Sequence, residues 1–236
     1  GGGDLRSFVI VLVMGVSAYA TISGPLAKVR LNLFPVIPLE SSTPPSLSYL
    51  GSQFLGINSA AVGSIIGIIF LIYGLFNWKN KITLNSIFWS VIVAVAIVGG
   101  WIGTSWVATS TYEPINIQSF TFVAPVGETI LYAMYGSAIN IKFGIGAVLG
   151  VLIGAFFGSM IKGHFRWEAC EDPRELKRQI LGASIMGIGA VISLGCSVGQ
   201  GLTAFSTLSY SAPLTLLSIY FGARIGLFQL IEGFQI

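Results

Sequence analysis

The sequence predicts an all-α polytopic membrane protein. Hydrophobic residues make up 54% of its 236 residues and charged residues only 9%, with a mean hydropathy of +0.84. A soluble domain carries about 25% charged residues, so this chain cannot cover a folded surface with polar groups. Its 30 glycines suit helices that pack closely in lipid. The net charge of +3 lies in short loops and gives no reason to expect a nucleic-acid partner.

Apolar runs of about 20 residues mark the expected membrane-spanning helices. About six such runs occur, at residues 8–26, 59–76, 87–107, 143–161, 180–194 and 213–230. We interpret residues 1–236 as a single transmembrane permease domain. The chain begins without Met and without a basic region before its first apolar run. We therefore expect it to be the C-terminal portion of a longer chain.

Two shorter segments are predicted as helices that do not cross the membrane. Pro125 suits the first position of a short helix running toward Tyr135. Fewer than 15 residues then remain before Gly136, which favours a re-entrant half-helix. Residues 46–57, in the later part of the loop 28–58, are expected to form a short interfacial helix.

Basic residues predict the orientation of the chain. Lys79 and Lys81 fall on the same side as the loop 162–178, which is rich in Lys and Arg. The positive-inside rule places this side in the cytoplasm and the loops 28–58 and 109–119 opposite. This alternation holds only if the half-helix that follows residue 119 does not cross.

Two further local signals concern helix packing and a helix start. Glycines four residues apart let a neighbouring backbone approach closely. We expect such packing at Gly146, Gly150, Gly154 and Gly158, and at Gly63 and Gly67. A helix is also expected to begin with Asp172 as N-cap, Pro173 as its first residue and Glu175 as its third.

A polar break interrupts the apolar stretch 180–230. Backbone can break inside a bilayer only where protein or water satisfies the freed N–H and C=O groups. Broken helices with small polar residues mark the binding sites of transporters. A break also exposes a helix N-terminus, whose N–H groups and dipole attract anions. We therefore predict substrate-binding residues at Gly195, Cys196, Ser197, Gly199, Gln200 and Gly201.

The glycines of this break allow positive φ and let a ligand touch the backbone. The alternative is a glycine kink in a packed helix, with Cys196 as an ordinary small core residue. If the ligand is a dianion, a thiolate about 4 Å away would be repelled by roughly 8 kcal/mol at an effective dielectric constant of about 20. We therefore expect a neutral Cys196 that donates a weak S–H hydrogen bond, which suits a sulfur-rich anion.

A second wall of the site is predicted at Pro125, Gly127, Glu128 and Thr129. An acidic residue at membrane depth is a functional candidate, so Glu128 could carry a coupling proton. The alternative is a carboxylate that caps its own short helix. Arg224 is either a counter-charge for the substrate or for Glu128, or a side chain that reaches an interface.

Other chemistry is not indicated. Cys170 lies in a loop dense in charge and we interpret it as incidental. A lone His164 excludes a histidine-rich metal site, and no nucleotide-binding motif occurs. We predict no catalytic residue, no metal and no cofactor.

These residues resemble the YeeE/YedE (sulphur transport) family of integral membrane proteins. The matching segments are residues 1–6, 119–129, 165–168 and 194–202. The Gly-Cys-x-x-Gly-Gln-Gly element is fairly specific and the others are supportive. The resemblance implies a multi-pass permease of the bacterial inner membrane for thiosulfate, or for a related sulfur or selenium species.

The resemblance also implies an internal architecture. Inverted repeats would bring short half-helices to the centre, where cysteines line the substrate path, and Cys196 falls on one of these cysteine positions. Further cysteines are expected upstream of Gly1 in the longer chain. A cytoplasmic sulfur-carrier protein as a partner is implied by the resemblance alone.

Uptake of a small sulfur-containing anion is therefore the leading hypothesis, and we do not expect an enzyme. One alternative is a membrane sulfurtransferase that forms a persulfide on Cys196. It requires a reactive thiolate, and no basic residue neighbours Cys196 in sequence. The other alternative is a purely structural membrane subunit with kinked helices.

Overall fold

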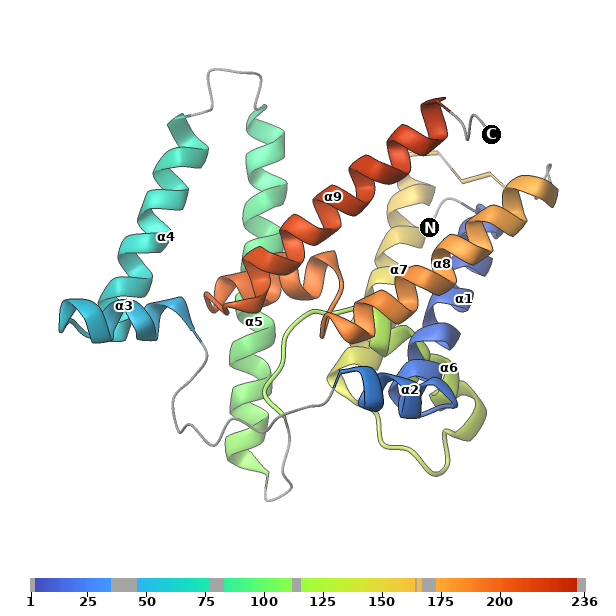
Figure 1. Cartoon of the computed structure of the whole chain (residues 1–236), viewed down its shortest axis with the longest axis horizontal. Helices are drawn as coiled ribbons and strands as arrows, with labels where there is room; N and C mark the ends of the chain where they lie inside the picture. Colours follow the sequence, from blue (N-terminus) through green and yellow to red (C-terminus); the bar gives the residue numbers. More distant parts are fainter. Residues whose placement is uncertain are drawn as a thin grey trace. The chain divides into compact units, whose positions relative to one another are not determined.

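The computed structural model describes residues 3–34, 46–76, 83–111, 116–163, 165–166 and 173–232 (Figure 1). The chain divides into two compact units. The first unit comprises Gly1–Ile37 and Phe120–Gly199, and the second comprises Pro38–Ser119 and Gln200–Ile236. Where described, both units are built from helices, with one isolated antiparallel bridge between Ser46 and Ser209.

The first unit is arranged around its first helix. Its helices are α1 (Leu5–Ile22), α2 (Leu26–Leu33), α6 (Val123–Tyr135), α7 (Phe143–Ile161) and α8 (Pro173–Ile192). Helix α1 packs against α2, α6 and α8, and α6 also packs against α7 and α8. Figure 1 shows α8 running along α1. Ala18 on α1 is completely buried in this arrangement.

Glycines allow the helices of the first unit to come close. A Cβ added to Gly127 of α6 would lie 2.6 Å from the carbonyl oxygen of Gly15 on α1. A Cβ on Gly144 of α7 would lie 2.7 Å from Cγ of Pro125, and one on Gly187 of α8 would lie 2.6 Å from the carbonyl oxygen of Met14. No side chain fits at these distances, so glycine is required where the helices touch.

The second unit contains α3 (Leu47–Leu55), α4 (Ser59–Phe76), α5 (Leu84–Ser110), most of a π-helix (Gly199–Ala204) and α9 (Ser211–Glu232). Helices α3 and α4 meet at a bend of 114°. The backbone N–H of Leu47 donates to the carbonyl of Leu208 over 2.8 Å, which ties α3 to the segment before α9. Trp101 of α5 donates from Nε1 to Oγ of Ser206 over 3.2 Å in the same region.

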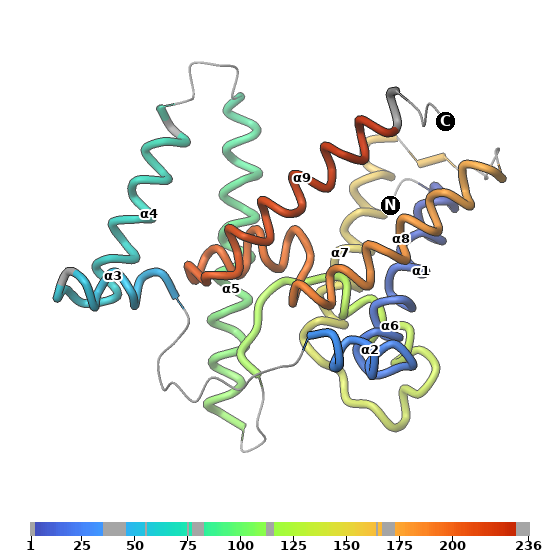
Figure 2. Tube along the Cα trace, in the orientation of Figure 1, coloured from blue at the N-terminus to red at the C-terminus, as the bar shows by residue number. Residues whose placement is uncertain are grey.

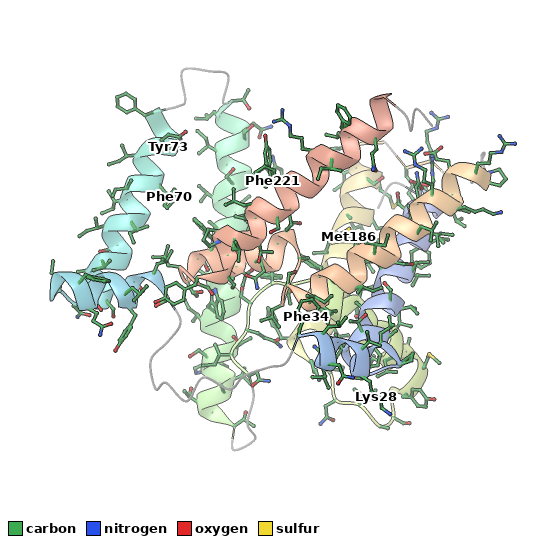
Figure 3. All side chains as sticks on the ribbon, viewed as in Figure 1. Lys28, Phe34, Phe70, Tyr73, Met186 and Phe221 are labelled. Atoms are coloured by element: carbon green, nitrogen blue, oxygen red, sulfur yellow. The ribbon has the colours of Figure 1, made fainter. Side chains whose placement is uncertain are left out.

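The fold class is confirmed. Four described helices are long and apolar enough to cross a membrane, namely α1, α5, α7 and the part of α9 from Ser211 to Gln229. The bent pair of α3 and α4 makes up to five if it forms one span. Side chains such as Phe70, Tyr73 and Phe221 are more than half exposed on their helices, as suits contact with lipid (Figure 3).

Most predicted helix bounds are close to the observed ones. Helices α4 and α7 begin and end at the predicted residues, and α5 extends the prediction by three residues at each end. Helix α8 is not among the apolar spans because its first turns carry the charged residues 174, 175, 177 and 178. Pro173 is the first residue of α8, as predicted, whereas Asp172 lies outside the described residues.

Three predictions of local structure are wrong. Helix α1 ends at Ile22 instead of residue 26, because Gly24 and Pro25 follow and a separate short helix, α2, begins at Leu26. The part of the loop 28–58 that α2 occupies is therefore helical. Pro125 is the third residue of α6, not the first, since the helix begins at Val123.

The predicted row of packing glycines meets no neighbour within the described part of the chain. No atom there lies within 4 Å of a Cβ built on Gly146, Gly150, Gly154 or Gly158. The same holds for Gly67, and Gly63 meets only ordinary contacts at 3.8 Å or more. The described helices of the first unit pack on other glycines, and packing along this row stays a prediction.

Candidate functional site

The chain breaks after α8, as predicted. Helix α8 ends at Ile192, and the chain turns before it enters the next helical segment at Ser197 (Figure 2). The N–H of Gly195 donates to the carbonyl of Ala190 over 2.8 Å, and Oγ of Ser193 donates to the carbonyl of Gly195 over 2.9 Å. These bonds satisfy backbone groups that the end of α8 would otherwise leave open.

Gly195, Gly199 and Gly201 do not use the positive φ that glycine allows. The left-handed residue is Leu194, with φ of 60°. Glycine is needed instead for close approach, because a Cβ on Gly199 would lie 2.8 Å from Oγ1 of Thr121. A Cβ on Gly201, in the second unit, would lie 2.9 Å from Cδ2 of Leu216.

Cys196 precedes the second helical segment and caps it. Its Sγ accepts the backbone N–H of Gly199 over 3.4 Å. The backbone N–H groups of Val198, Phe122 and Val123 lie near the same sulfur. Phe122 and Val123 lie at the start of α6. The N-terminus of α6 and the helical turn that starts at Ser197 are therefore both close to one sulfur atom, where helix dipoles favour negative charge.

The same cysteine belongs to the core of the first unit. Cys196 is 8% exposed and packs with Ala18, Val123 and Val191. Partly buried Met14 of α1 contributes to the same cluster. Cys196 is thus packed as a core residue, and its role in binding stays a prediction.

The other polar residues of the break lie in different settings. Ser197 is exposed, and its hydroxyl makes no hydrogen bond to a described residue. Gln200 is 5% exposed in the second unit, where its Oε1 accepts the hydroxyl of Ser211 over 3.0 Å. Gln200 thus joins the π-helix to the start of α9. A single turn of π-helix inside an α-helical segment is frequent at functional sites.

The predicted second wall, residues 125–129, is partly a packing surface. Pro125 and Gly127 are buried against α7 and α1 through the close approaches given above. Oγ1 of Thr129 donates to the carbonyl of Pro125 over 2.7 Å. Pro125 and Gly127 thus fit α6 closely against α7 and α1, whereas the bond of Thr129 lies within α6.

Glu128 pairs with a lysine at the start of α7. Nζ of Lys142 lies 3.0 Å from Oε1 of Glu128, and the two side chains are 57% and 29% exposed. The interpretation of Glu128 as a capping carboxylate is wrong. Because α6 begins at Val123, Glu128 is its sixth residue and lies beyond the first turn.

Sequence reasoning missed Thr121 as a candidate. It lies in the extended stretch before α6, with its hydroxyl against Gly199. No spacing rule selects a threonine two residues before a helix, and its closeness to Cys196 arises only from the fold. Arg224 lies on α9 in the second unit, and Cys170 lies outside the described residues.

Two cavities lie away from the thiol. One of about 480 Å³ in the second unit is bordered by α3, α4 and residues 205–208, with hydroxyl groups of Ser48, Ser59, Ser206 and Thr207 in its lining. An apolar one of about 250 Å³ lies between α1 and α6 in the first unit and includes Gly127. Cys196 lines neither cavity.

Comparison with known proteins agrees with the motifs of the chain. A family model described as sulphur transport matches residues 1–225. A thiosulfate transporter, TsuA, of Escherichia coli K12 is 27% identical over 137 residues, which cover 57% of this chain and 37% of that protein. The TsuA of Spirochaeta thermophila is 26% identical over 231 residues, or 94% of this chain and 66% of that protein. The chain thus spans about a third of one relative and just under two thirds of the other.

Proposed function

Because this chain belongs to the sulphur transport family, we propose that it forms the cysteine-bearing part of a membrane permease that takes up thiosulfate. The observation that carries the proposal is the convergence of two helix N-termini on Sγ of Cys196. Two relatives named as thiosulfate transporters support the choice of substrate. Related sulfur or selenium species are the alternatives within the same class.

The cradle around Cys196 matches the chemistry of thiosulfate. This ion is a small dianion with one soft terminal sulfur and three oxygens. Helix N-termini stabilise an anion with backbone N–H groups and need no buried cation. An anion held in this way keeps its charge compensated and is released more readily than one paired with a buried Arg or Lys.

The protonation state of the thiol follows from the charge of the ligand. Sγ of Cys196 accepts the N–H of Gly199. Its own hydrogen then points away from this amide and can be donated to the terminal sulfur of the substrate. A thiolate would instead repel a dianion about 4 Å away by roughly 8 kcal/mol at an effective dielectric constant of about 20. A neutral Cys196 therefore serves uptake.

The remaining predicted residues take supporting parts in this proposal. Gly195, Ser197 and Gly199 border the thiol along the chain, and Gln200 and Gly201, within the π-helix, contact Ser211 and Leu216 of α9. Residues 125–129 position the N-terminus of α6, and Glu128 is the candidate for a coupling proton, with Lys142 as its partner. The protein would lie in the bacterial inner membrane, where the lipid bilayer covers its apolar helices. A cytoplasmic sulfur-carrier protein would receive the imported sulfur species.

A sulfurtransferase is the second candidate, because backbone N–H groups around Cys196 would also stabilise a thiolate. The thiolate would attack the terminal sulfur of thiosulfate, forming a persulfide. The S–S bond of the substrate would break, and sulfite would leave with the electron pair. Trapping of a persulfide on Cys196 after exposure to thiosulfate would identify this reaction.

Uptake of radiolabelled thiosulfate tests the proposal. A bacterium without its own thiosulfate uptake would express the complete gene, with Cys196→Ala and Cys196→Ser beside it. Gly146→Ala is the matched control, since no described atom lies near that position. We expect uptake with the wild type and the control and strong loss with Cys196→Ala, at equal amounts in the membrane. Absence of uptake with the wild type would contradict thiosulfate as substrate.

A further inference from the structure

We propose that the hydroxyl of Thr121 binds an oxygen atom of the substrate beside Cys196 and so helps to determine specificity. This inference rests on the proposed function and adds a residue to the site. Thr121 belongs to the first unit, as do Cys196 and Gly199.

Thr121 and Cys196 both lie close to Gly199. A point one bond from the Cα of Gly199, where a Cβ would stand, lies 2.8 Å from Oγ1 of Thr121 and 3.8 Å from Sγ of Cys196. The hydroxyl and the thiol therefore border the same face of Gly199. An ion as small as thiosulfate can touch both groups at once.

Position 199 requires glycine because Thr121 lies so close to it. A Cβ there would approach Oγ1 of Thr121 more closely than packed atoms allow. The side chain of Thr121 thus occupies space that Gly199 leaves open. The N–H of the same glycine donates to the sulfur of Cys196. One residue therefore accommodates the hydroxyl and orients the thiol.

The hydroxyl of Thr121 differs in its hydrogen bonding from those of the other threonines in this unit. The other threonines in the described part of the first unit, Thr21 and Thr129, donate to carbonyls four residues earlier in their helices. Thr121 lies in extended chain before α6, is half-buried, and makes no hydrogen bond to a described residue. Its hydroxyl can therefore be donated to a ligand.

The chemistry of the ligand assigns the two groups different parts. The terminal sulfur of thiosulfate is soft and polarisable and suits the thiol of Cys196. Its oxygens are strong acceptors and suit an O–H donor such as Thr121, beside the backbone N–H groups of Phe122 and Val123. Thr121 would then bind the oxygen end of the ion and Cys196 the sulfur end. Such a site selects ions that carry both oxygen and a soft sulfur atom.

Crossed substitutions test the hydroxyl separately from packing. Thr121→Val keeps the shape but removes the O–H, whereas Thr121→Ser keeps the O–H but removes a methyl group. In radiolabelled thiosulfate uptake by cells that express the complete gene, Thr121→Val should raise the half-saturation concentration about tenfold or more, the loss expected for a hydrogen bond to a charged group. Thr121→Ser should stay close to the wild type, and the maximal rate per membrane-inserted protein should change less than the half-saturation concentration.

Opposite results would overturn the inference. If Thr121→Val transports like the wild type while Thr121→Ser is impaired, Thr121 acts through packing. If Thr121→Val does not reach the membrane, Thr121→Ala replaces it, and an unchanged half-saturation concentration with that variant would overturn the inference as well. A wild type without uptake would refute the proposed function and this inference with it. A transporting wild type with unaffected Thr121 variants refutes this inference alone.

Discussion

Gly127 of α6 lies directly against the carbonyl oxygen of Gly15 on α1, so that a Cβ on Gly127 would approach that oxygen to 2.6 Å. A Cβ on Gly15 would in turn lie 2.5 Å from Cγ1 of Val126. Both helices thus carry a glycine at their crossing. The N-terminus of α6 lies beside Cys196, so this crossing positions the amide groups near the thiol.

Gly127→Ala should destabilise the first unit by about 1–3 kcal/mol, the usual cost of overpacking. The methyl group would meet backbone, which cannot rotate away as a side chain can. The measurement is the thermal unfolding of the purified protein in detergent. Gly146→Ala is the control and should leave the unfolding temperature unchanged or slightly higher, since nothing described lies within 4 Å of it. An unchanged Gly127→Ala would show that the crossing can widen freely.

Helix positions could be predicted where apolar length alone decides them. The bounds of α4 and α7 follow from runs of apolar residues ended by polar ones. Helix α2 was missed because its polar residues, Lys28 and Arg30 among them, gave no apolar signal. The glycines that pack could not be chosen from spacing, because any four-residue row makes a smooth face and only the fold decides which face is covered.

The position of the candidate site could be predicted from the sequence, but the full set of groups around Cys196 could not. A polar break in an apolar stretch identified Cys196 and the helix start that follows it. The second set of amides, at Phe122 and Val123, comes from a segment more than 70 residues earlier in the chain. The glycines of the break would allow positive φ, yet it occurs at Leu194, where bonds of the neighbouring residues to α8 close the turn.

Asp4 caps α1 and should make the start of this helix sensitive to acid. Its Oδ1 accepts the N–H of Arg6 over 3.0 Å, and the hydroxyl of Ser7 donates to its other oxygen. The hydrogen bond from Ser7, with these backbone partners, holds the pKa of the Asp4 carboxyl below its ordinary value. A lowered pKa in the folded state stabilises the helix start above the unfolded pKa of about 3.9.

This contribution should be constant at neutral pH and should disappear as the pH falls below about 3.9 through the lowered value. Amide hydrogen exchange at residues 6–8 measures it, with faster exchange expected at acid pH after correction for the intrinsic rate. Asp4→Ala should exchange quickly at every pH, whereas Asp4→Asn, which keeps a capping oxygen, should lose mainly the pH dependence. Equal acid sensitivity in Asp4→Ala and the wild type would contradict the role of this carboxyl.

An ion pair joins the starts of α1 and α8. Nη1 of Arg6 lies 3.0 Å from Oε1 of Glu175, with side-chain exposures of 33% and 53%. Such a partly exposed pair contributes about 0.2–1 kcal/mol. Arg6→Glu and Glu175→Arg should each lower the unfolding temperature, and the double exchange should restore part of the loss. High salt should reduce the difference, and purely additive losses would show that the two charges do not interact.

Glu128 and Lys142 offer a separable test of coupling. Neutralising Lys142 as Lys142→Met removes the ion pair but leaves a carboxyl group at position 128. If Glu128 carries a coupling proton, Glu128→Gln should abolish the stimulation of uptake by an inward proton gradient. Lys142→Met should retain that stimulation at a lower stability, by about 1 kcal/mol or less. If both variants respond to the gradient as the wild type does, Glu128 serves only to hold α6 against the start of α7.

Leu194 occupies the position after α8 where helices prefer glycine. Its φ of 60° is left-handed, and the N–H of the following Gly195 reaches back to the carbonyl of Ala190, as in a Schellman C-terminus. A non-glycine residue there costs roughly 1–2 kcal/mol. Leu194→Gly should therefore stabilise the protein by about 1 kcal/mol, measured by thermal unfolding in detergent, provided that the 80% exposed leucine side chain gives up few contacts.

Glycine just inside the helix provides the comparison for that gain. Ile192→Gly should destabilise the protein by about 1 kcal/mol, since a glycine inside a helix gains no strain relief. Substitution by glycine should thus lower the stability at position 192 and raise it at position 194. Because the turn at Leu194 sets the direction in which the chain enters Cys196, Leu194→Gly should also leave the half-saturation concentration for thiosulfate unchanged if the bonds from Gly195 and Ser193 suffice to hold the turn. A stabilised variant with weaker substrate binding would instead show that the strained leucine keeps the thiol in register with the start of α6.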